Sequence, residues 1–573
     1  MQNYKLLVVR QINKLTEGTE EGEILSLLEY PVNRQMGDIS LPCFKLSKKM
    51  KMSPQAIAEN LQRNLSCDTF IERVEAVSGY LNIFLDKGQF ASGVIHHVLE
   101  ADERFGAQNI GQGRTVVIDF SSPNIAKPFH VGHLRSTVIG NALYQIHSFQ
   151  GYKCIGINHL GDWGTQFGKL IVAYQNWGDK EQVMQGAIDE LLRLYVKFHE
   201  EAEQNPELEE QARAWFVKLE QGDEQALTLW RWFVDISLGE FKRIYELLGI
   251  TFDYFTGESF YNDKMDKVIK ELQHKNLLVE DDGARIVKLD EFNMPPALMI
   301  KKDGSSLYHT RDVAAAIYRK ETFHFEKALY VTDYAQNLHF QQWFKIIELM
   351  GCEWASELIH VPFGRVSLEG MSLSTRKGNV VKLEELLQQA IDKIQAIIEE
   401  KNANLENKAE IARQVGVGAV IFNDLSGNRI KDVVFSWETA LNFEGETGPY
   451  VQYTHARASS VLRKANQGQA VPWSGQEMAI EPALLREREA LEVIWQLYHF
   501  TDKIELAMMK LEPSIVSRYL VDLAQAFNRF YHDHPILVED AAVRNARLSL
   551  VKAVQITLRN GLRLIGLQSP ERL

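Results

Sequence analysis

The sequence predicts an α/β protein of several domains, with a doubly wound parallel sheet in the centre, an α/β module before it and an all-helical domain after it. Three observations carry this prediction. A strand, a polar loop, a long helix and a second strand follow one another between residues 115 and 157. From about residue 384 onward, apolar residues recur at helical spacing. With 573 residues, the chain is also too long for a single hydrophobic core.

Residues 1 to about 110 form the predicted N-terminal α/β module. Ser53 and Pro54 precede apolar residues at helical spacing and predict a capped helix. The segment 75–85 alternates on both sides of a glycine and predicts two strands joined by a turn. The glycine-rich stretch 109–113 breaks both periodicities, so we place the end of the module there.

The central domain is predicted to span residues 111–383, and its strands are short apolar runs. The first, at 115–120, is β-branched and bounded by polar residues, as expected of a buried parallel strand. Further strands are predicted at 153–157, 328–331 and 359–361. Ligands of such sheets bind beyond the carboxyl ends of the strands, so we expect the functional site in the loops that follow them.

Helical regions complete the architecture. Residues 175 to about 290 are mostly amphipathic helix and predict an insertion into the sheet domain. Residues 384–448 predict a helical connecting region. The last domain, 449–573, is predicted to be entirely helical, with its clearest helices at 484–510 and 515–531.

Composition excludes several classes of protein. No apolar run approaches the roughly 20 residues that span a bilayer, and no signal peptide is visible, so we expect no membrane association. Cys43, Cys67, Cys154 and Cys352 lie far apart without a Cys-x-x-Cys pair, which argues against zinc and disulfides and favours the cytoplasm. The net charge of −13, from 63 basic and 76 acidic residues, neither supports nor excludes an RNA partner.

The segment from Ser121 to His133 predicts a phosphate-binding site. It lies between a predicted strand and a predicted helix, where free backbone N–H groups and the helix dipole favour an anion. Gly132 would let a nucleotide approach the backbone, and His130 and His133 would both donate to phosphate oxygens, lowering a phosphoryl-transfer barrier. Alternatively, the histidines are ordinary polar residues at a helix start. Their position after a strand favours the phosphate site.

This segment resembles the class I aminoacyl-tRNA synthetases. His130-Val131-Gly132-His133 resembles their His-Ile-Gly-His signature, and the longer string 121–133 resembles the arginyl branch. The segment 158–168, after the second strand, is also similar to that branch. The resemblance implies a Rossmann-like catalytic domain in which Lys127, His130, Gly132 and His133 are catalytic.

The family carries a second nucleotide loop, Lys-Met-Ser-Lys-Ser, whose lysines meet the ATP phosphates. Residues 371–379 match it, although Ser372 and Thr375 occupy both lysine positions. Arginyl enzymes often lack the second lysine, and Lys127 is expected to replace it. The residues expected to bind ATP here are Ser374, Thr375, Arg376 and Lys377.

The segment around Tyr308 and Asp312 predicts the amino-acid pocket. A guanidinium is planar, always charged and offers five donors, so its pocket should present carboxylates and a flat or polar wall. Tyr308 and Asp312 are four apart and share one side of a helix. Alternatively, Asp312 pairs with Arg311 or caps the helix, and Tyr308 belongs to the core. By resemblance, the arginine-binding residues are Asp119, Asn124, His133, Tyr308, Asp312 and Gln336.

The resemblance implies an arginine–tRNA ligase that uses ATP, with Mg²⁺ on the phosphates but no dedicated protein metal site. Arginine is first converted to arginyl-adenylate and then transferred to the terminal ribose of the tRNA, which is needed for the first step. The N-terminal module would contact the outer corner of the tRNA and 449–573 would bind the anticodon. In the latter, Tyr453, His455 and Arg457 are either base platforms or core residues. We expect a monomer.

Three other functions remain open at this stage. The first is another class I synthetase, such as a lysyl or glutamyl enzyme, against which Asn124, Tyr308 and Asp312 argue. The second is a nucleotidyltransferase that acts on small molecules. The helical C-terminal domain argues against it, because such an enzyme has no use for this domain. The third is an inactive RNA-binding paralogue, which the altered second loop favours and the intact histidine motif opposes.

Overall fold

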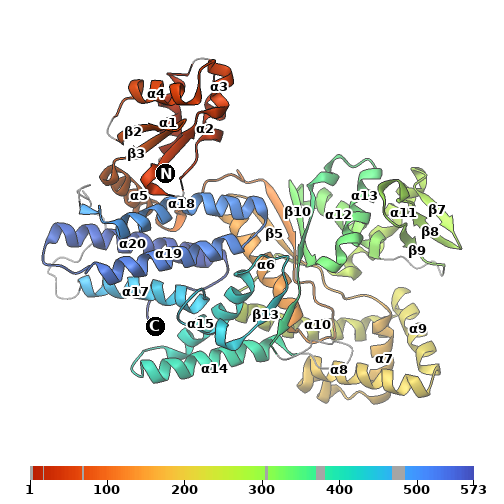
Figure 1. The fold of residues 1–573 in the computed structure, drawn as a ribbon. Coiled ribbons are helices and arrows are strands. Elements are labelled where there is room, and N and C mark those ends of the chain that lie inside the picture. The colour runs from red at the N-terminus through yellow and green to blue at the C-terminus, as the bar shows by residue number, and fades with distance from the viewer. Residues whose placement is uncertain are drawn as a thin grey trace. The chain divides into compact units, whose positions relative to one another are not determined.

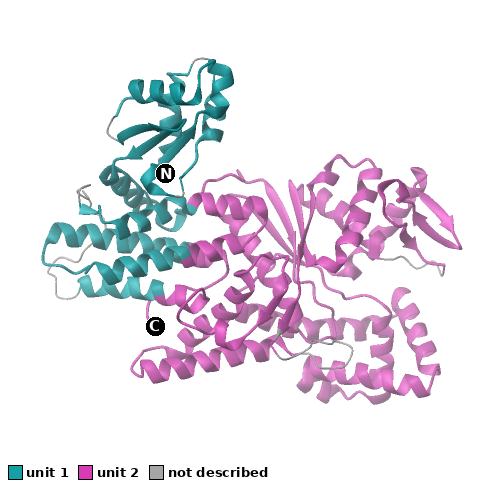
Figure 2. Ribbon diagram, viewed as in Figure 1, with its two compact units in different colours: residues 1–105, 454–500, 522–560 teal, residues 106–453, 501–521, 561–573 magenta. Residues whose placement is uncertain are grey.

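The computed structural model divides into two compact units (Figure 2). Unit 1 comprises residues 1–105, 454–500 and 522–560, and unit 2 comprises residues 106–453, 501–521 and 561–573. The residues that the structure describes are 4–16, 19–31, 33–67, 70–302, 308–369, 381–466 and 484–573. Within these residues, no helix is both long and apolar enough to cross a membrane.

The N-terminal part of unit 1 is an α/β module, as predicted, with a three-stranded antiparallel sheet of which two strands were expected. The strand order is β1-β3-β2, and the strands are β1 (Ile39–Pro42), β2 (Ile71–Val77) and β3 (Tyr80–Leu85). Its helices are α1 (Tyr4–Asn13), α2 (Glu21–Leu27), α3 (Phe44–Met50), α4 (Pro54–Asn64) and α5 (Lys87–Ala101). The predicted cap of α4 is present, since Ser53 Oγ accepts a hydrogen bond from the Ala56 N–H at 3.2 Å. The hairpin turns at Gly79, whose φ of 84° favours glycine.

Unit 2 contains a five-stranded parallel sheet with the strand order β11-β10-β4-β5-β6 (Figure 1). Its strands are β4 (Thr115–Asp119), β5 (Lys153–Asn158), β6 (Tyr254–Phe255), β10 (Lys327–Asp333) and β11 (Leu358–Phe363). Four of these were expected, and their parallel pairing confirms the doubly wound fold. The chain order reverses between β4 and β10, which is where doubly wound sheets open a ligand crevice.

Helices cover both faces of this sheet. In Figure 1, α6 (Val131–Phe149) lies on one side, while α12 (Tyr308–Phe323) and α13 (Asn337–Leu349) lie on the other. Apolar residues of the sheet and of α12 and α13 share one core, which includes Trp343 and Leu358. The carboxyl ends of β4 and β10 are therefore flanked by the start of α6 and by the first turns of α12 and α13.

The region between β5 and β10 contains the predicted helices and also an unpredicted sheet. The helices are α7 (Thr165–Trp177), α8 (Lys180–Gln204), α9 (Glu207–Glu220), α10 (Glu224–Leu248) and α11 (Met265–His274). The antiparallel strands β7 (Leu278–Asp281), β8 (Ala284–Val287) and β9 (Ala297–Ile300) follow. The region up to residue 290 is mostly helical, as expected, but β7 and β8 at its end were not predicted. The Asp282-Gly283 pair, with φ of 47° and 78°, is a hairpin signal in the sequence.

The described residues after 383, namely 384–466 and 484–573, are mostly helical, with one short strand among them. The helices are α14 (Leu383–Lys401), α15 (Lys408–Leu425), α16 (Trp437–Ala440), α17 (Gly448–Asn466), α18 (Arg488–Lys510), α19 (Ser514–Asp533) and α20 (Ala541–Leu564). Strand β13 (Val433–Phe435) departs from the prediction and pairs in parallel with β12 (Val366–Leu368). In α17, His455 is buried, so this histidine belongs to the core rather than to an exposed base platform.

Candidate active site

The loop that follows β4 is held in an unusual backbone conformation. Ser121, Ser122 and Ala126 have φ of 72°, 50° and 60°, in the left-handed region that non-glycine residues rarely adopt. Hydrogen bonds compensate, because the Ser121 N–H donates to Ser136 Oγ at 2.8 Å and the Ala126 N–H donates to Ser237 Oγ at 3.0 Å. Strain that the surroundings hold in place is characteristic of functional sites.

His130 and His133 form a reciprocal cap at the start of α6. The Gly132 N–H donates to His130 Nδ1 at 3.0 Å, and the His130 N–H donates to His133 Nδ1 at 3.1 Å. In both neutral rings the proton therefore sits on Nε2, which is left as a donor. Burial lowers the pKa of His130, with a smaller contribution from Lys127, and burial followed by His130 lowers that of His133 to about 3. Both rings are thus neutral N–H donors at pH 7.

Gly132 is needed by the histidine cap itself. A Cβ at this position would lie 2.7 Å from Cε1 and 2.8 Å from Nδ1 of the His130 ring. The prediction explained this glycine by the approach of a nucleotide, whereas the structure supplies a second reason. Lys127 is exposed and lies close enough to lower the pKa of both histidines, so a positive charge stands beside the two donors.

The predicted second nucleotide loop, with Ser374, Thr375, Arg376 and Lys377, lies outside the described residues. The residues on either side of this stretch are described. Before it, the Glu369 N–H donates to the Phe435 carbonyl at 3.1 Å. After it, the Val131 N–H donates to the Val381 carbonyl at 3.2 Å, next to His130. The described part of the chain after this stretch therefore begins beside the histidine motif.

A cavity of about 400 Å³ opens at the carboxyl ends of β4 and β10. Five of the six predicted arginine-binding residues line it: Asp119, Asn124, Tyr308, Asp312 and Gln336. His133, the sixth, is not among its lining residues. Tyr308 is 62% exposed, so it does not belong to the core, and its ring is available as a wall of the cavity.

Three carboxylates line this cavity, and each faces a base. The pairs are Asp119 with Arg319 at 2.8 Å, Glu258 with Arg311 at 3.1 Å, and Asp312 with His339 at 2.5 Å. Asp312 is therefore not paired with Arg311, contrary to one of the two possibilities left open by the sequence. Burial raises the pKa of Glu258 to about 7, against the opposing attraction of Arg311. The cavity thus presents three carboxylates, the kind of acceptor that a cationic ligand requires.

The structure adds cavity residues that the sequence did not single out, among them His159, Glu258, Arg319, His339 and Trp343. Glu258 comes from the short stretch after β6, where Gly257-Glu258-Ser259 offers little periodicity to interpret. His339 and Trp343 come from α13, whose other residues read as an ordinary amphipathic helix. The sequence therefore contains no signal that singles out Glu258, His339 or Trp343.

The segment after β5 shapes the cavity through backbone contacts. Asn124 and Gly161 form an isolated parallel bridge, and a Cβ on Gly161 would lie 2.0 Å from Asn124 Oδ1. The buried Asn158 side chain donates to the Tyr245 hydroxyl at 2.8 Å. Asp162 accepts hydrogen bonds from the backbone and the hydroxyl of Ser259, at 2.8 and 2.6 Å. These contacts fix both Asn124 and the residue that follows Glu258.

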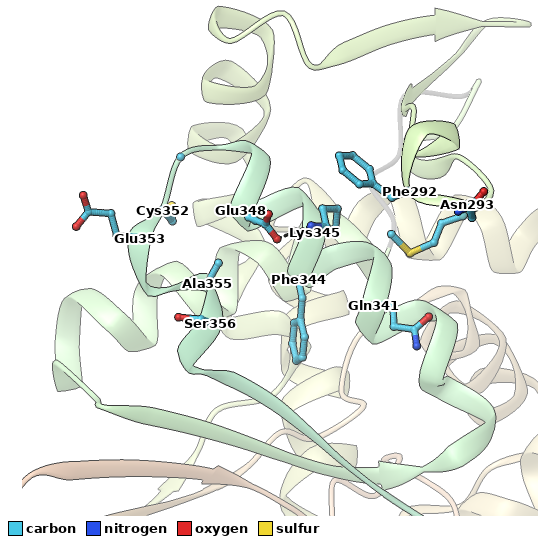
Figure 3. A pocket seen from close by; sticks show the side chains of 12 residues that line it. Phe292, Asn293, Gln341, Phe344, Lys345, Glu348, Cys352, Glu353, Ala355 and Ser356 are labelled. Carbon is cyan, nitrogen blue, oxygen red and sulfur yellow. Dashed lines mark hydrogen bonds and ion pairs between the residues drawn. The ribbon is translucent and has the colours of Figure 1, made fainter. Parts of the chain in front are cut away.

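A second cavity, of about 920 Å³, lies on another face of α13 (Figure 3). Its lining includes Phe292, Phe344 and the ion pair between Lys345 and Glu348, at 2.5 Å. It contains no residue of the histidine motif and shares no lining residue with the first cavity. Although it is larger, its two acidic residues are Glu348, which is paired with Lys345, and Glu353, and it contains none of the residues that the sequence predicted for a site.

Family models account for nearly the whole chain. The model described as "tRNA synthetases class I (R), catalytic domain" matches residues 94–437, which is more than half of the 573 residues. The chain belongs to the class I arginyl-tRNA synthetase family. The "Arginyl tRNA synthetase N terminal domain" matches residues 2–85, and the "DALR anticodon binding domain" matches residues 451–573.

Individual members of the arginyl-tRNA synthetase family are similar over the full length. The arginine–tRNA ligase of Alkaliphilus metalliredigens is 56% identical over 577 residues, and that of Clostridioides difficile is 55% identical over 573 residues; each comparison covers 100% of both chains. Thermus thermophilus arginyl-tRNA synthetase has a TM-score of 0.80 at 26% identity, with 100% of both chains covered. That of Plasmodium falciparum matches the fold with a TM-score of 0.78 at 24% identity, covering 100% of this chain and 98% of the other. The predicted family and fold class are confirmed.

Proposed function

We propose that the chain is an arginine–tRNA ligase that uses ATP and that its cavity at the ends of β4 and β10 holds arginine. The observation that carries the proposal is the combination of Asp312, Glu258 and Tyr308 in one cavity, at the switch point of the sheet. Membership of the arginyl-tRNA synthetase family supports the reaction and its substrates ATP, arginine and tRNA.

Arginine is recognised mainly by charge and shape. Asp312 and Glu258 accept hydrogen bonds from the guanidinium, whose planar donors match carboxylate oxygens. The exposed ring of Tyr308 covers one side of the group. Asp119, Asn124 and Gln336 orient the rest of the amino acid, with His133 near its carboxylate. Lysine, a compact point charge, cannot satisfy two separated carboxylates in the same way.

ATP binds at the start of α6. The Nε2–H groups of His130 and His133 donate to phosphate oxygens, and Lys127 adds positive charge. Ser374, Thr375, Arg376 and Lys377 complete the phosphate site. Among the described residues, no cluster of three or more His, Cys, Asp or Glu could hold a metal ion. Mg²⁺ is expected to enter with the ATP phosphates as part of the substrate.

The reaction has two steps. An arginine carboxylate oxygen attacks the α-phosphorus in line, and the bond from that phosphorus to the bridging oxygen of pyrophosphate breaks. A terminal ribose hydroxyl of the tRNA then attacks the arginyl carbonyl carbon, loses its proton and displaces AMP. The protein contributes orientation and preset donors to both steps rather than a covalent intermediate.

The tRNA contacts the domains around the catalytic domain. Residues 1–110 meet its outer corner, 111–383 carry the catalytic sheet, 384–448 connect, and 449–573 read the anticodon. We expect tRNA to be required for arginine activation. The chain acts as a monomer in the cytoplasm, where the free thiols of its four cysteines stay reduced.

Aminoacylation of unfractionated tRNA with labelled arginine tests the proposal, with lysine, glutamate and cysteine as controls. Arginine alone should be attached. Attachment of another amino acid would show that the chain has the activity of a different class I synthetase. If none is attached although tRNA binds, the chain is an inactive RNA-binding paralogue and the proposal is wrong.

A further inference from the structure

A chain of polar side chains extends from the arginine cavity into the interior between α12 and α13. Asp312 Oδ2 lies 2.5 Å from His339 Nε2, and His339 Nδ1 lies 3.2 Å from His309 Nε2. His309 Nε2 in turn lies 3.1 Å from Gln342 Oε1, and Gln342 Nε2 donates to the Pro295 carbonyl at 2.8 Å. This network of hydrogen-bonded side chains therefore extends from the carboxylate of Asp312 in the cavity to the backbone before β9.

The direction of the hydrogen bonds follows from the chemistry of the end groups. An ionised carboxylate only accepts, so Nε2 of His339 must carry a proton and donate to Asp312. The Pro295 carbonyl also only accepts, which fixes the Gln342 amide with its oxygen toward His309. Because the Gln342 oxygen only accepts, Nε2 of His309 donates, and Nδ1 of His339, which carries no proton in the neutral ring, accepts from the same N–H. The position of His339 is thus set from both sides.

We propose that His339 is a positioning residue for arginine recognition, which acts by holding Asp312, and that His309 and Gln342 hold His339. This inference rests on the proposed function of the cavity. With Oδ2 engaged by His339, the carboxylate of Asp312 cannot rotate about its Cβ–Cγ bond. Its Oδ1 therefore keeps one direction for a guanidinium N–H.

The surroundings explain why such a device is needed. The side chain of Asp312 is 27% exposed and that of His339 is 25% exposed, so water competes for the carboxylate. Glu258 is the other carboxylate proposed for the guanidinium, and Arg311 holds it at 3.1 Å. Both acidic groups are therefore oriented by a basic neighbour before the substrate arrives. Gln342 is buried, so the end of this side-chain network that is far from the cavity lies in the interior.

The test compares three variants of the full-length chain. His339→Leu removes the donor at similar volume, His339→Gln retains an N–H near the position of Nε2, and Lys345→Met is a matched control. Lys345 lies on another face of α13, beside Glu348 in the second cavity (Figure 3). The assay is arginine-dependent ATP–pyrophosphate exchange with tRNA present, which gives KM for arginine, KM for ATP and kcat.

His339→Leu should raise KM for arginine about tenfold or more, the effect of losing one hydrogen bond to a charged group, while kcat and KM for ATP change less than about threefold. His339→Gln should restore most of the affinity, and Lys345→Met should match the unmodified chain. An unchanged KM for arginine in His339→Leu overturns the inference. A parallel loss of kcat and of ATP affinity also overturns it, because that pattern indicates a general structural role.

A double variant tests whether His309 acts through His339. His309→Leu should raise KM for arginine by a smaller factor, and adding it to His339→Leu should have no further effect. If the two substitutions raise KM for arginine additively, the proposal that His309 acts through His339 is contradicted. If the unmodified protein shows no exchange with arginine, the proposed function fails. If it does, and Asp312→Ala abolishes exchange while His339→Leu leaves KM unchanged, only the inference about His339 fails.

Discussion

Arginine affinity should depend on pH through Glu258. Burial raises the pKa of this carboxyl to about 7, and the nearby carboxyls of Asp312 and Asp162 act in the same direction. The guanidinium needs the ionised form, so binding below pH 7 must release a proton. Between pH 8 and pH 6 the ionised fraction falls from about nine tenths to about one tenth, which weakens arginine binding about tenfold. Affinity therefore falls as the pH falls.

Titration calorimetry at both pH values, in buffers of different ionisation enthalpy, measures affinity and proton release together. Glu258→Gln should bind arginine weakly at both values and should lose most of the pH dependence. Glu348→Gln, an acidic residue of α13 outside this cavity, should behave like the unmodified chain. An unchanged pH dependence in Glu258→Gln would refute the assignment of the titrating group.

Three further predictions follow from the geometry. Asp312→Ala should lower arginine-dependent exchange by about 100-fold or more, as expected when a charged hydrogen-bonding partner is removed, while ATP binding measured by titration stays nearly intact; exchange at the normal rate would disprove the pocket assignment. Gly161→Ala should displace Asn124, whose Oδ1 lies 2.0 Å from the new Cβ, and raise KM for arginine several-fold at unchanged melting temperature; an unaltered KM would show that Asn124 does not contact arginine. Arg135→Leu should destabilise the fold by about 3–5 kcal/mol, because it leaves buried Asp424, 3.1 Å away, as an unpaired charge. Thermal melting should show that Arg135→Leu/Asp424→Leu recovers much of this loss, and a double variant as unstable as the single one would contradict the explanation.

The main elements of the fold were predictable because their sequence patterns are strong. The run 115–120 and the strand at 153–157 are β-branched and flanked by turns, and both are strands of the parallel sheet. Strands β7 and β8 were missed because four-residue strands with charged residues have no clear period. Strand β13 was missed for a similar reason, since three residues pair only with β12, a contact that the local sequence does not encode.

The candidate site was only partly predictable. Asp119 and Asn124 were found through the resemblance to the family, because they lie within or next to its recognisable motif after the first strand. Glu258 and His339 could not be found in this way, because they reach the cavity from separate elements and their importance lies in burial and in partners. The reciprocal cap of His130 and His133 was also unforeseen, because it depends on side-chain geometry at the helix start rather than on residue type.

Arginine-dependent ATP–pyrophosphate exchange, with and without unfractionated tRNA, tests the central claim most directly. Lysine, glutamate and cysteine serve as control amino acids. The account predicts exchange with arginine alone, and only when tRNA is present. Exchange with a different amino acid, or with none, would contradict the claim that this cavity selects arginine for attachment to tRNA.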